Sequence, residues 1–257
     1  MAIYLRQICL VAEKLAPVVD DLSEALSIAP CFVDPAVGKF GLENTLLAVG
    51  SKFIEVVAPV EPNTAAGRFL ERRGGDGGYM VICQSPTLQE QAQLRQRAQQ
   101  ADVRIAYESD RSTWNIMQLH PADMGASFLE FDWDEEEDVT GNWHPAGGKA
   151  WKNKVNLDGA FEIVAVELQG SDPLGLARRW ADIMALPLES LNGIPTVKLA
   201  NAEIRFVADQ DGRGDGLSAL DFKVRNREHL LAKAEKRGVQ VSGTQLTICG
   251  TRLNLTS

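Results

Sequence analysis

The sequence predicts an α+β fold in which one strand, one helix and three more strands form a module that occurs four times along 257 residues. The first observation is a short β-branched run at residues 52–59, closed by a proline and holding one carboxylate, Glu55. The second is the return of the Phe-aliphatic-Glu pattern at residues 128–130, 75 positions after residues 53–55. Because side chains alternate faces along a strand, each Glu points to one defined side of its sheet.

The first module begins with a predicted strand over residues 7–12. Pro17 fits the first turn of the helix that follows, which is expected to stop before Pro30. Strands are predicted at 31–33, 45–49 and 52–59, and a short helix at 64–73. The glycine-rich residues 74–78 precede a strand and lack a phosphate-loop ending, so they predict a tight loop, with a ligand-lining role as the alternative. The apolar stripe of the first helix comprises Leu15, Val18, Val19, Leu22 and Leu26.

The second module repeats this order. Strands are predicted at residues 79–83, 103–107, 114–119 and 128–131, with a Gln-rich helix over 86–101 after the first strand. Residues 132–160 then break the pattern, because an acidic run at 132–138 is followed by several glycines and an Asn-Trp-His-Pro segment. This composition predicts an interdomain linker that carries some aromatic anchors.

The third and fourth modules follow the linker. The third has predicted strands at 161–168, 196–199 and 202–207, and a helix that starts at the capping pair Asp172-Pro173. The fourth has strands at 217–224, 239–241, 245–249 and 252–255, and a helix that stops at Gly238. We therefore expect an N-terminal domain of two modules at 1–132, a linker at 133–160, and a C-terminal domain of two shorter modules at 161–257.

Composition limits the partners and the compartment. The formal net charge of −9 argues against a nucleic-acid backbone or an anionic membrane surface, because both need clustered Lys and Arg. No run of about eighteen apolar residues occurs, and the N-terminus lacks the pattern of a secretion signal. The cysteines form no C-x-x-C pair, which predicts a reduced, cytoplasmic protein. As its assembly state we expect either a monomer or a homodimer. These cysteines are Cys9, Cys31, Cys83 and Cys249.

Four consecutive modules of this kind resemble the vicinal oxygen chelate superfamily, which includes glyoxalase I, methylmalonyl-CoA epimerase, extradiol dioxygenases and the bleomycin-type resistance proteins. The similarity is strongest at residues 7–26, 43–59 and 120–130, and the last stretch resembles the ending of methylmalonyl-CoA epimerases. The resemblance implies four βαβββ modules that form two paired glyoxalase-like half-barrel domains. Membership in such a superfamily does not by itself fix the function.

The resemblance also implies a site. In that superfamily a divalent metal lies in a cup, held by a residue on the first strand and a Glu on the last strand of each module. Here Gln7, Glu55 and Glu130 match three of these positions, while the first strand of the second module offers Met80, or Tyr79 if the register slips by one. Oxygen ligands suit Mg or Mn better than Zn, and Ni is a further metal of the superfamily.

The C-terminal modules match the pattern less well. Arg205 and Asn254 stand where Glu55 and Glu130 stand in the first half, and the first-strand positions hold Ala165 and Ala219. A cation at the ligand position opposes metal binding. The functional prediction therefore points to the N-terminal half and weakens the extradiol dioxygenase alternative.

The leading functional hypothesis is an enzyme, a lyase or isomerase that acts on a small organic carbonyl or vicinal-oxygen compound. Two buried carboxylates near each other raise at least one pKa, and a raised carboxylate is a competent general base. Glu55 and Glu130 are then the candidate bases or ligands. His120 is a third catalytic candidate, or it simply fixes the loop before the last strand of its module.

The alternative is a metal-free small-molecule binding protein of the bleomycin-resistance type. In such a protein the cup binds an organic ligand by shape, through an apolar wall. An extradiol-dioxygenase-like protein is the second alternative. The candidate wall residues are Phe53, Tyr79, Met80 and Trp114.

Overall fold

The computed structural model describes residues 2–257, and it contains all four modules in the predicted order. The chain divides into two compact units, and neither is continuous in sequence. Unit 1 contains most of modules two and three, and unit 2 contains most of modules one and four. The domain limits predicted from the sequence follow module order instead, and they remain predictions. Unit 1 comprises the N-terminal segment through Gln7, Tyr79–His144 and Ala165–Leu217, and unit 2 comprises Ile8–Gly78, Pro145–Val164 and Ser218–Ser257.

Module one is built as expected around an amphipathic helix and a long hairpin. Helix α1 buries the apolar stripe found in the sequence, and β3 pairs with β4 in antiparallel register, with Leu46 opposite Glu55. Gly50 turns the hairpin at φ 61°, and a Cβ there would collide with the carbonyl oxygen of Phe161. The elements are β1 (Tyr4–Val11), α1 (Leu15–Leu26), β2 (Pro30–Phe32), η1 (Pro35–Phe40), β3 (Leu42–Val49), β4 (Lys52–Pro59) and α2 (Ala65–Arg73).

The start of β1 belongs to unit 1, where a side chain of module three fixes it. Asn201 Oδ1 accepts a hydrogen bond from Leu5 N at 2.8 Å, and Asn201 Nδ2 donates to Leu5 O at 3.0 Å. The amide thus bonds β1 as a neighbouring strand would. This contact places Arg6 and Gln7 within unit 1.

Module two has one difference from the sequence prediction that matters for function. Strand β8 ends at Asp134, whereas the sequence predicted an end at Phe131 and assigned Asp134 to a linker. Both aspartates are buried and paired with β7, Asp132 opposite Ile116 and Asp134 opposite Trp114. The elements are β5 (Gly77–Gln84), α3 (Leu88–Gln100), β6 (Ile105–Asp110), β7 (Trp114–Leu119), α4 (Pro121–Met124) and β8 (Phe128–Asp134).

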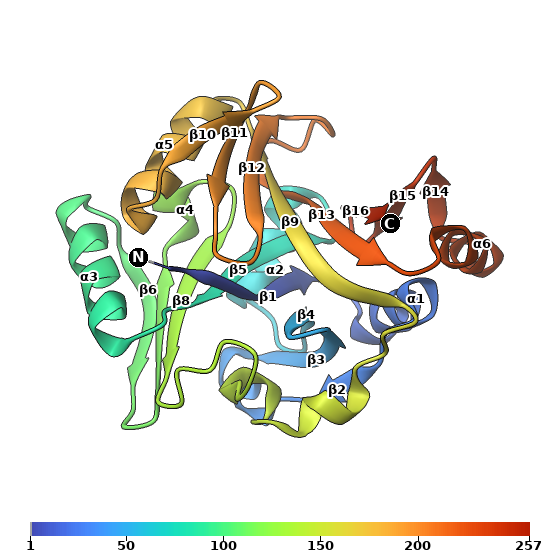
Figure 1. Ribbon diagram of the computed structural model, residues 1–257, viewed down its shortest axis with the longest axis horizontal. Helices are drawn as coiled ribbons and strands as arrows, with labels where there is room; N and C mark the ends of the chain where they lie inside the picture. The colour runs from blue at the N-terminus through green and yellow to red at the C-terminus, as the bar shows by residue number, and fades with distance from the viewer. Residues whose placement is uncertain (1) are drawn as a thin grey trace. The chain divides into compact units, whose positions relative to one another are not determined.

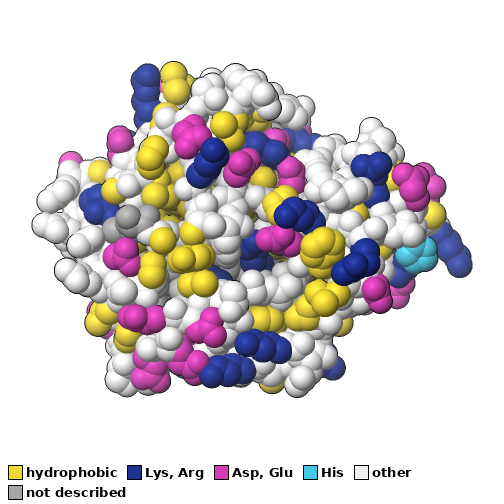
Figure 2. Space-filling model, viewed as in Figure 1, with side chains coloured by type: hydrophobic (Ala, Val, Ile, Leu, Met, Phe, Trp, Pro, Cys, Tyr) yellow, Lys and Arg dark blue, Asp and Glu magenta, His cyan; other side chains and the backbone are white. Residues whose placement is uncertain are grey.

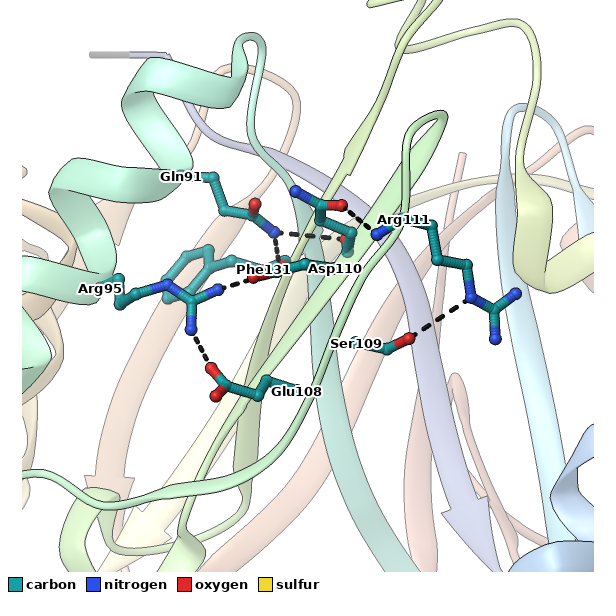
Figure 3. Close-up of polar contacts among 8 residues, drawn as sticks. Gln91, Arg95, Glu108, Ser109, Asp110, Arg111 and Phe131 are labelled. Carbon is teal, nitrogen blue, oxygen red and sulfur yellow. Dashed lines mark hydrogen bonds and ion pairs between the residues drawn. The ribbon is translucent and has the colours of Figure 1, made fainter.

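Helix α3 has a weak apolar face and is attached to its sheet by polar contacts instead (Figure 3). Buried Gln91 donates from Nε2 to Phe131 O at 2.8 Å and to Asn115 O at 3.2 Å. Arg95 pairs with Glu108 and, at 3.2 Å, with Asp110. Gln91 therefore ties the helix to β7 and β8 next to Asp132.

Module three contains a strand that the sequence analysis missed. Strand β10 lacks β-branched residues, but it forms a hairpin with β11 through Asn192 and Gly193, whose φ values are 52° and 83°. An Asn-Gly pair with both φ positive is the type I′ turn that tight hairpins prefer. The elements are β9 (Ala160–Gly170), α5 (Pro173–Met184), β10 (Leu188–Leu191), β11 (Ile194–Lys198) and β12 (Glu203–Ala208).

Module four follows the prediction closely. Asn226 caps α6 by accepting from His229 N at 3.0 Å, and Gly238 ends the helix at φ 82°. Figure 1 shows α6 beside the β14–β15 hairpin. The elements are β13 (Gly216–Val224), α6 (Arg227–Arg237), β14 (Gln240–Ser242), β15 (Gln245–Ile248) and β16 (Thr251–Thr256), and the segment before β9 holds η2 (His144–Ala146) and η3 (Ala150–Lys154).

In modules two to four the first strand pairs in parallel with the last strand. Ile82 lies opposite Glu130, so Met80, two positions earlier on β5, shares the sheet face of Glu130, whereas Tyr79 does not. In the C-terminal modules the parallel pairing of first and last strands places an acidic residue opposite each residue that stands where modules one and two have Glu55 and Glu130. Glu167 lies opposite Arg205, and Asp221 lies opposite Asn254.

Within residues 2–257, every helix is too short or too polar to cross a bilayer. On the face drawn in Figure 2, Lys and Arg side chains are interspersed with Asp and Glu.

Candidate functional site

Three carboxylates share one face of β8. Glu130, Asp132 and Asp134 alternate with apolar or aromatic residues along the strand, and all three are buried, Asp132 completely. Buried acids are costly unless they are paired or protonated, so they are rare in structural cores. Their concentration on one strand face makes this part of unit 1 the best candidate for a functional site.

Asp132 is the central member of this ladder. Its Oδ2 accepts a hydrogen bond from the indole Nε1 of Trp114 at 3.2 Å. Burial, then the negative charge of Glu130, then a hydrogen bond with Glu130 raise the pKa of Asp132 well above its ordinary value. The raised pKa favours the protonated form of Asp132 beside the carboxylate of Glu130.

Asp134 is held by residues that follow β8 in the chain. Asn142 Nδ2 donates to Asp134 Oδ2 at 2.6 Å, and His144 Nε2 lies 3.3 Å from the same oxygen. The His144 ring also stacks on Trp114, with centroids 5.1 Å apart and an interplanar angle of 11°. The predicted linker thus begins as a structured cover over the carboxylates.

Arg6 supplies a positive charge beside these acids. It is completely buried, and its Nη1 donates to Gln84 Oε1 at 2.6 Å and to Asp138 O at 3.2 Å. Its guanidinium lies over the ring of Trp143, 4.7 Å from the ring centroid. Burial lowers the pKa of Arg6 to about 10, opposed by the charges of nearby aspartates, so the side chain stays charged at neutral pH.

Gln7, a predicted metal ligand, is buried in unit 1 and hydrogen-bonded to Trp143, in the segment that follows β8. Its Oε1 accepts a hydrogen bond from the indole Nε1 of Trp143 at 2.8 Å, and Trp143 itself is completely buried. The oxygen that a metal would need is therefore already used by an indole N–H.

Glu55 and Phe53 belong to unit 2. Glu55 is buried, and its Oε1 accepts from Asn44 Nδ2 at 2.6 Å, while Asn44 Oδ1 accepts from Asp34 N at 2.9 Å. Phe53 packs edge-to-face against Trp151 with centroids 5.1 Å apart. Trp151 is an aromatic anchor from the segment predicted as a linker.

The remaining predicted site residues lie in unit 1 with different roles. Tyr79 packs edge-to-face on Phe128, and Met80 is buried on the Glu130 face of the sheet. His120 caps α4, because its Nδ1 accepts from Ala122 N at 3.2 Å. This contact fits the loop-fixing role, and catalysis by His120 stays a prediction.

Unit 1 thus connects two predicted residues, Gln7 and Glu130, to a polar cluster that the sequence analysis missed. The missed signal was the period-two spacing of acids at positions 130, 132 and 134, which marks a strand face and not a linker. Nothing in the sequence alone pointed to the covering segment, residues 138–144, because its contacts with β1 join residues more than 130 positions apart. The missed members are Arg6, Gln84, Asp132, Asp134, Asn142, Trp143 and His144.

A divalent metal is compatible with the fold, but these residues do not fit one. Gln7 and Glu55 each accept a hydrogen bond from a protein donor, and the negative charge of Glu130 contributes to the raised pKa of Asp132. The fourth position holds Met80, whose thioether is a poor ligand for Mg or Mn. In the described part of the chain, no group of three His, Cys, Asp or Glu side chains is arranged to hold a metal ion.

Comparison with known proteins places the fold. No protein-family model matches the chain, and no curated protein sequence matches it. A mutant of 4-hydroxymandelate synthase from Streptomyces coelicolor is similar over 93% of this chain and 76% of its own, with TM-score 0.70 and 14% identity. A hypothetical protein from Staphylococcus aureus is similar over 100% of this chain and 99% of its own, with TM-score 0.66 and 12% identity.

A third solved structure covers only half of the chain. Methylmalonyl-CoA epimerase from Mycobacterium tuberculosis matches 51% of this chain and 87% of its own, with TM-score 0.44 and 22% identity. Identities this low show the fold alone, and the two matches that span nearly the whole chain carry that conclusion. The protein therefore has the four-module fold of the vicinal oxygen chelate superfamily, as the resemblance predicted.

Proposed function

We propose that this protein is an enzyme that moves a proton on a small organic carbonyl compound, and that Glu130 and Asp132 do so without a resident metal. The observation that carries the proposal is the pair of buried carboxyl groups two positions apart on one face of β8, where burial and the charge of Glu130 raise the pKa of Asp132. One proton shared between two carboxyl groups provides an acid and a base at the same place.

The proposed step needs no group beyond these residues. Glu130 accepts the proton from the carbon next to the substrate carbonyl, and the electron pair of that C–H bond moves onto the carbonyl oxygen to give an enolate. Asp132 donates its proton in a hydrogen bond to the carboxylate or to the enolate oxygen. Return of the proton from Glu130 to the carbon restores the carbonyl compound, and epimerisation results where the enolate first turns its opposite face toward Glu130.

Trp114 has a positioning role in this scheme. Its indole N–H occupies Oδ2 of Asp132, which leaves the other carboxyl oxygen for the proton. The indole is in turn held by the stacked ring of His144. A fixed carboxyl orientation matters because proton transfer requires heavy atoms within hydrogen-bond distance.

The test uses solvent exchange, because it does not require the natural substrate. Protein in D₂O is incubated with a panel of 2-oxo acids, hydroxy ketones and acyl thioesters, and deuterium on the carbon next to the carbonyl is followed by NMR. We expect exchange with at least one compound class. Glu130→Gln should slow it by about 100-fold or more, the usual contribution of a general base.

Glu135→Gln is the matched control, because this exposed acid follows the ladder directly on the chain but contributes nothing to it. The Glu135→Gln protein should catalyse deuterium exchange at the wild-type rate. Equal exchange in the Glu130→Gln, Glu135→Gln and wild-type proteins would show that another group moves the proton.

A second candidate is a metal-free binding protein of the bleomycin-resistance type. It is favoured by the aromatic side chains that contact the predicted site residues, Trp143 on Gln7 and Trp151 on Phe53. Such a protein would bind members of the panel without deuterium incorporation. The dioxygenase alternative gains no support, because Arg205 pairs with Glu167 at 3.8 Å at the position where a ligand would be needed.

A further inference from the structure

Arg6 is a completely buried cation whose contacts are all neutral. Its hydrogen-bond acceptors are the side-chain amide of Gln84 and the backbone carbonyls of Asp138 and Asn142, and its flat face rests on Trp143. Among residues 2–257, no carboxylate comes within ion-pair distance of its guanidinium. The charges of Asp138, Asp134 and Asp132 act on Arg6 from nearby, but none of these carboxylates hydrogen-bonds the guanidinium, so its polar N–H groups depend on neutral acceptors.

One edge of this guanidinium is left open. The Nε–H has no hydrogen-bond partner in the described structure, and Nη2 has only a 3.5 Å contact with Asn142 O, at the limit of a hydrogen bond. Nε and Nη2 form the edge through which arginine binds both oxygens of a carboxylate. Arg6 therefore presents an unused carboxylate-binding edge inside unit 1.

Gln84 adds a donor beside this edge. Its Oε1 is turned to Arg6 Nη1, so its Nε2 points elsewhere, and that buried nitrogen lacks a partner among residues 2–257. Gln84 also lies directly opposite Asp132 in the parallel pairing of β5 and β8. The two buried donors thus belong to side chains that are hydrogen-bonded to each other on the neighbouring strands β1 and β5, and Gln84 lies beside Asp132.

We propose that Arg6 and Gln84 form an anion subsite that binds the carboxylate of a small organic acid. A carboxylate supplies one negative charge and two acceptor oxygens, which match the charge of Arg6 and the free N–H groups. Binding of a carboxylate at this subsite does not depend on the proposed function. The identity of the substrate does rest on it: together they imply that Glu130 and Asp132 act on a carbonyl compound that carries a carboxylate. Entry requires the covering segment, residues 138–144, to move away from Arg6.

The experiment measures thermal stability and binding heat for full-length protein with pyruvate, propionate and acetate, each compared with its neutral amide. A ligand that binds the folded state raises Tm in proportion to its affinity. We expect a rise in Tm with the carboxylates and none with the amides. Equal responses to acids and amides would overturn the proposal.

Gln84→Glu separates binding from folding. The new carboxylate would lie on Arg6 itself and take the place of the ligand, so we expect Tm at neutral pH to stay at or above the wild-type value. Affinity for the carboxylates should fall at least about tenfold, which corresponds to 1.4 kcal/mol. The control is Gln96→Glu, which adds the same charge at an exposed position of α3 and should bind like the wild type.

The possible outcomes remain distinct from those of the proposed function. Carboxylate binding that Gln84→Glu abolishes, without deuterium exchange on any compound, supports the subsite and contradicts the reaction. Deuterium exchange with no preference for carboxylates supports the reaction and contradicts the subsite. No response to any carboxylate in the wild type means that the open donors of Arg6 and Gln84 hold only water, which overturns the subsite.

Discussion

At the scale of the residue, Asp132 shows how burial changes the chemistry of a side chain. The same carboxyl in water is ionised at neutral pH, but here desolvation and the neighbouring Glu130 raise its pKa and so favour its protonated form. Holding a proton in the folded state has a consequence for stability that does not depend on any substrate.

Asp132→Asn should change the pH dependence of stability. The unfolded carboxyl has a pKa of about 3.9, and the folded pKa is raised, so the folded state binds the proton more tightly. The wild type must therefore lose free energy of unfolding as pH rises from about 4 toward the folded pKa. An asparagine cannot ionise, so the stability of the variant relative to wild type should improve as pH rises.

Urea unfolding at several pH values measures this difference. Glu135→Gln, which removes an exposed acid, should follow the wild-type curve. A constant difference between Asp132→Asn and wild type across the pH range would mean that Asp132 is ionised in the folded protein.

Trp143→Phe tests the bond between the covering segment and Gln7. The ring is kept, but Gln7 Oε1 loses the indole N–H that it accepts at 2.8 Å. Loss of a buried hydrogen bond should cost about 1–3 kcal/mol of unfolding free energy. Adding Gln7→Leu should recover part of that loss in a double-mutant cycle, and strictly additive effects would show that the two side chains are not coupled.

At the scale of the element, helix α3 is held by buried polar contacts where apolar packing is scarce. Gln91→Leu removes both hydrogen bonds to the β7 and β8 carbonyls and should destabilise the protein by about 1–3 kcal/mol. Gln96→Leu, at an exposed position of the same helix, should change stability little. We expect the backbone amides of α3 and β8 to exchange faster in Gln91→Leu but not in Gln96→Leu. Equal exchange in the two variants would contradict the proposed role of Gln91 in holding the helix.

The covering segment, residues 138–144, is an irregular element attached mainly by side chains. Its contacts reach Arg6, Gln7 and Asp134, and no ladder of backbone hydrogen bonds supports it. Such segments open at lower free energy than paired strands. We expect its amides to exchange with solvent well before those of β8, and exchange of both at one rate would rule out local opening.

Strand and helix order was predictable because period-two and helical spacing were clear in every module. The errors came from tertiary context. Asp132 and Asp134 looked like a solvated acidic run until β7 was seen to pair with them, and β10 lacks strand-forming residues but closes through an Asn-Gly turn. At the site, Glu130 was found from its repeat, whereas Arg6 and Trp143 became visible only through contacts between distant segments.

At the scale of the whole molecule, the chain combines a well-known fold with an unusual donor set. The sequence predicted metal ligands at Gln7, Glu55 and Glu130, but in the structure Gln7 and Glu55 accept hydrogen bonds from Trp143 and Asn44, and Glu130 lies beside buried Asp132. In a thermal-shift titration of protein treated with chelator, we expect Mn, Mg, Ni and Zn to leave Tm unchanged. A saturable rise in Tm that the pair Glu55→Gln and Glu130→Gln abolishes would restore the metal hypothesis.

The most direct test of the central claim is deuterium exchange by chelator-treated protein in D₂O with a carbonyl compound that carries a carboxylate. We expect deuterium to enter the carbon next to the carbonyl with chelator present, Glu130→Gln to slow this exchange by about 100-fold or more, and Glu135→Gln to leave it unchanged. Exchange that appears only after a divalent metal is added, or that is unchanged in Glu130→Gln, would contradict this claim.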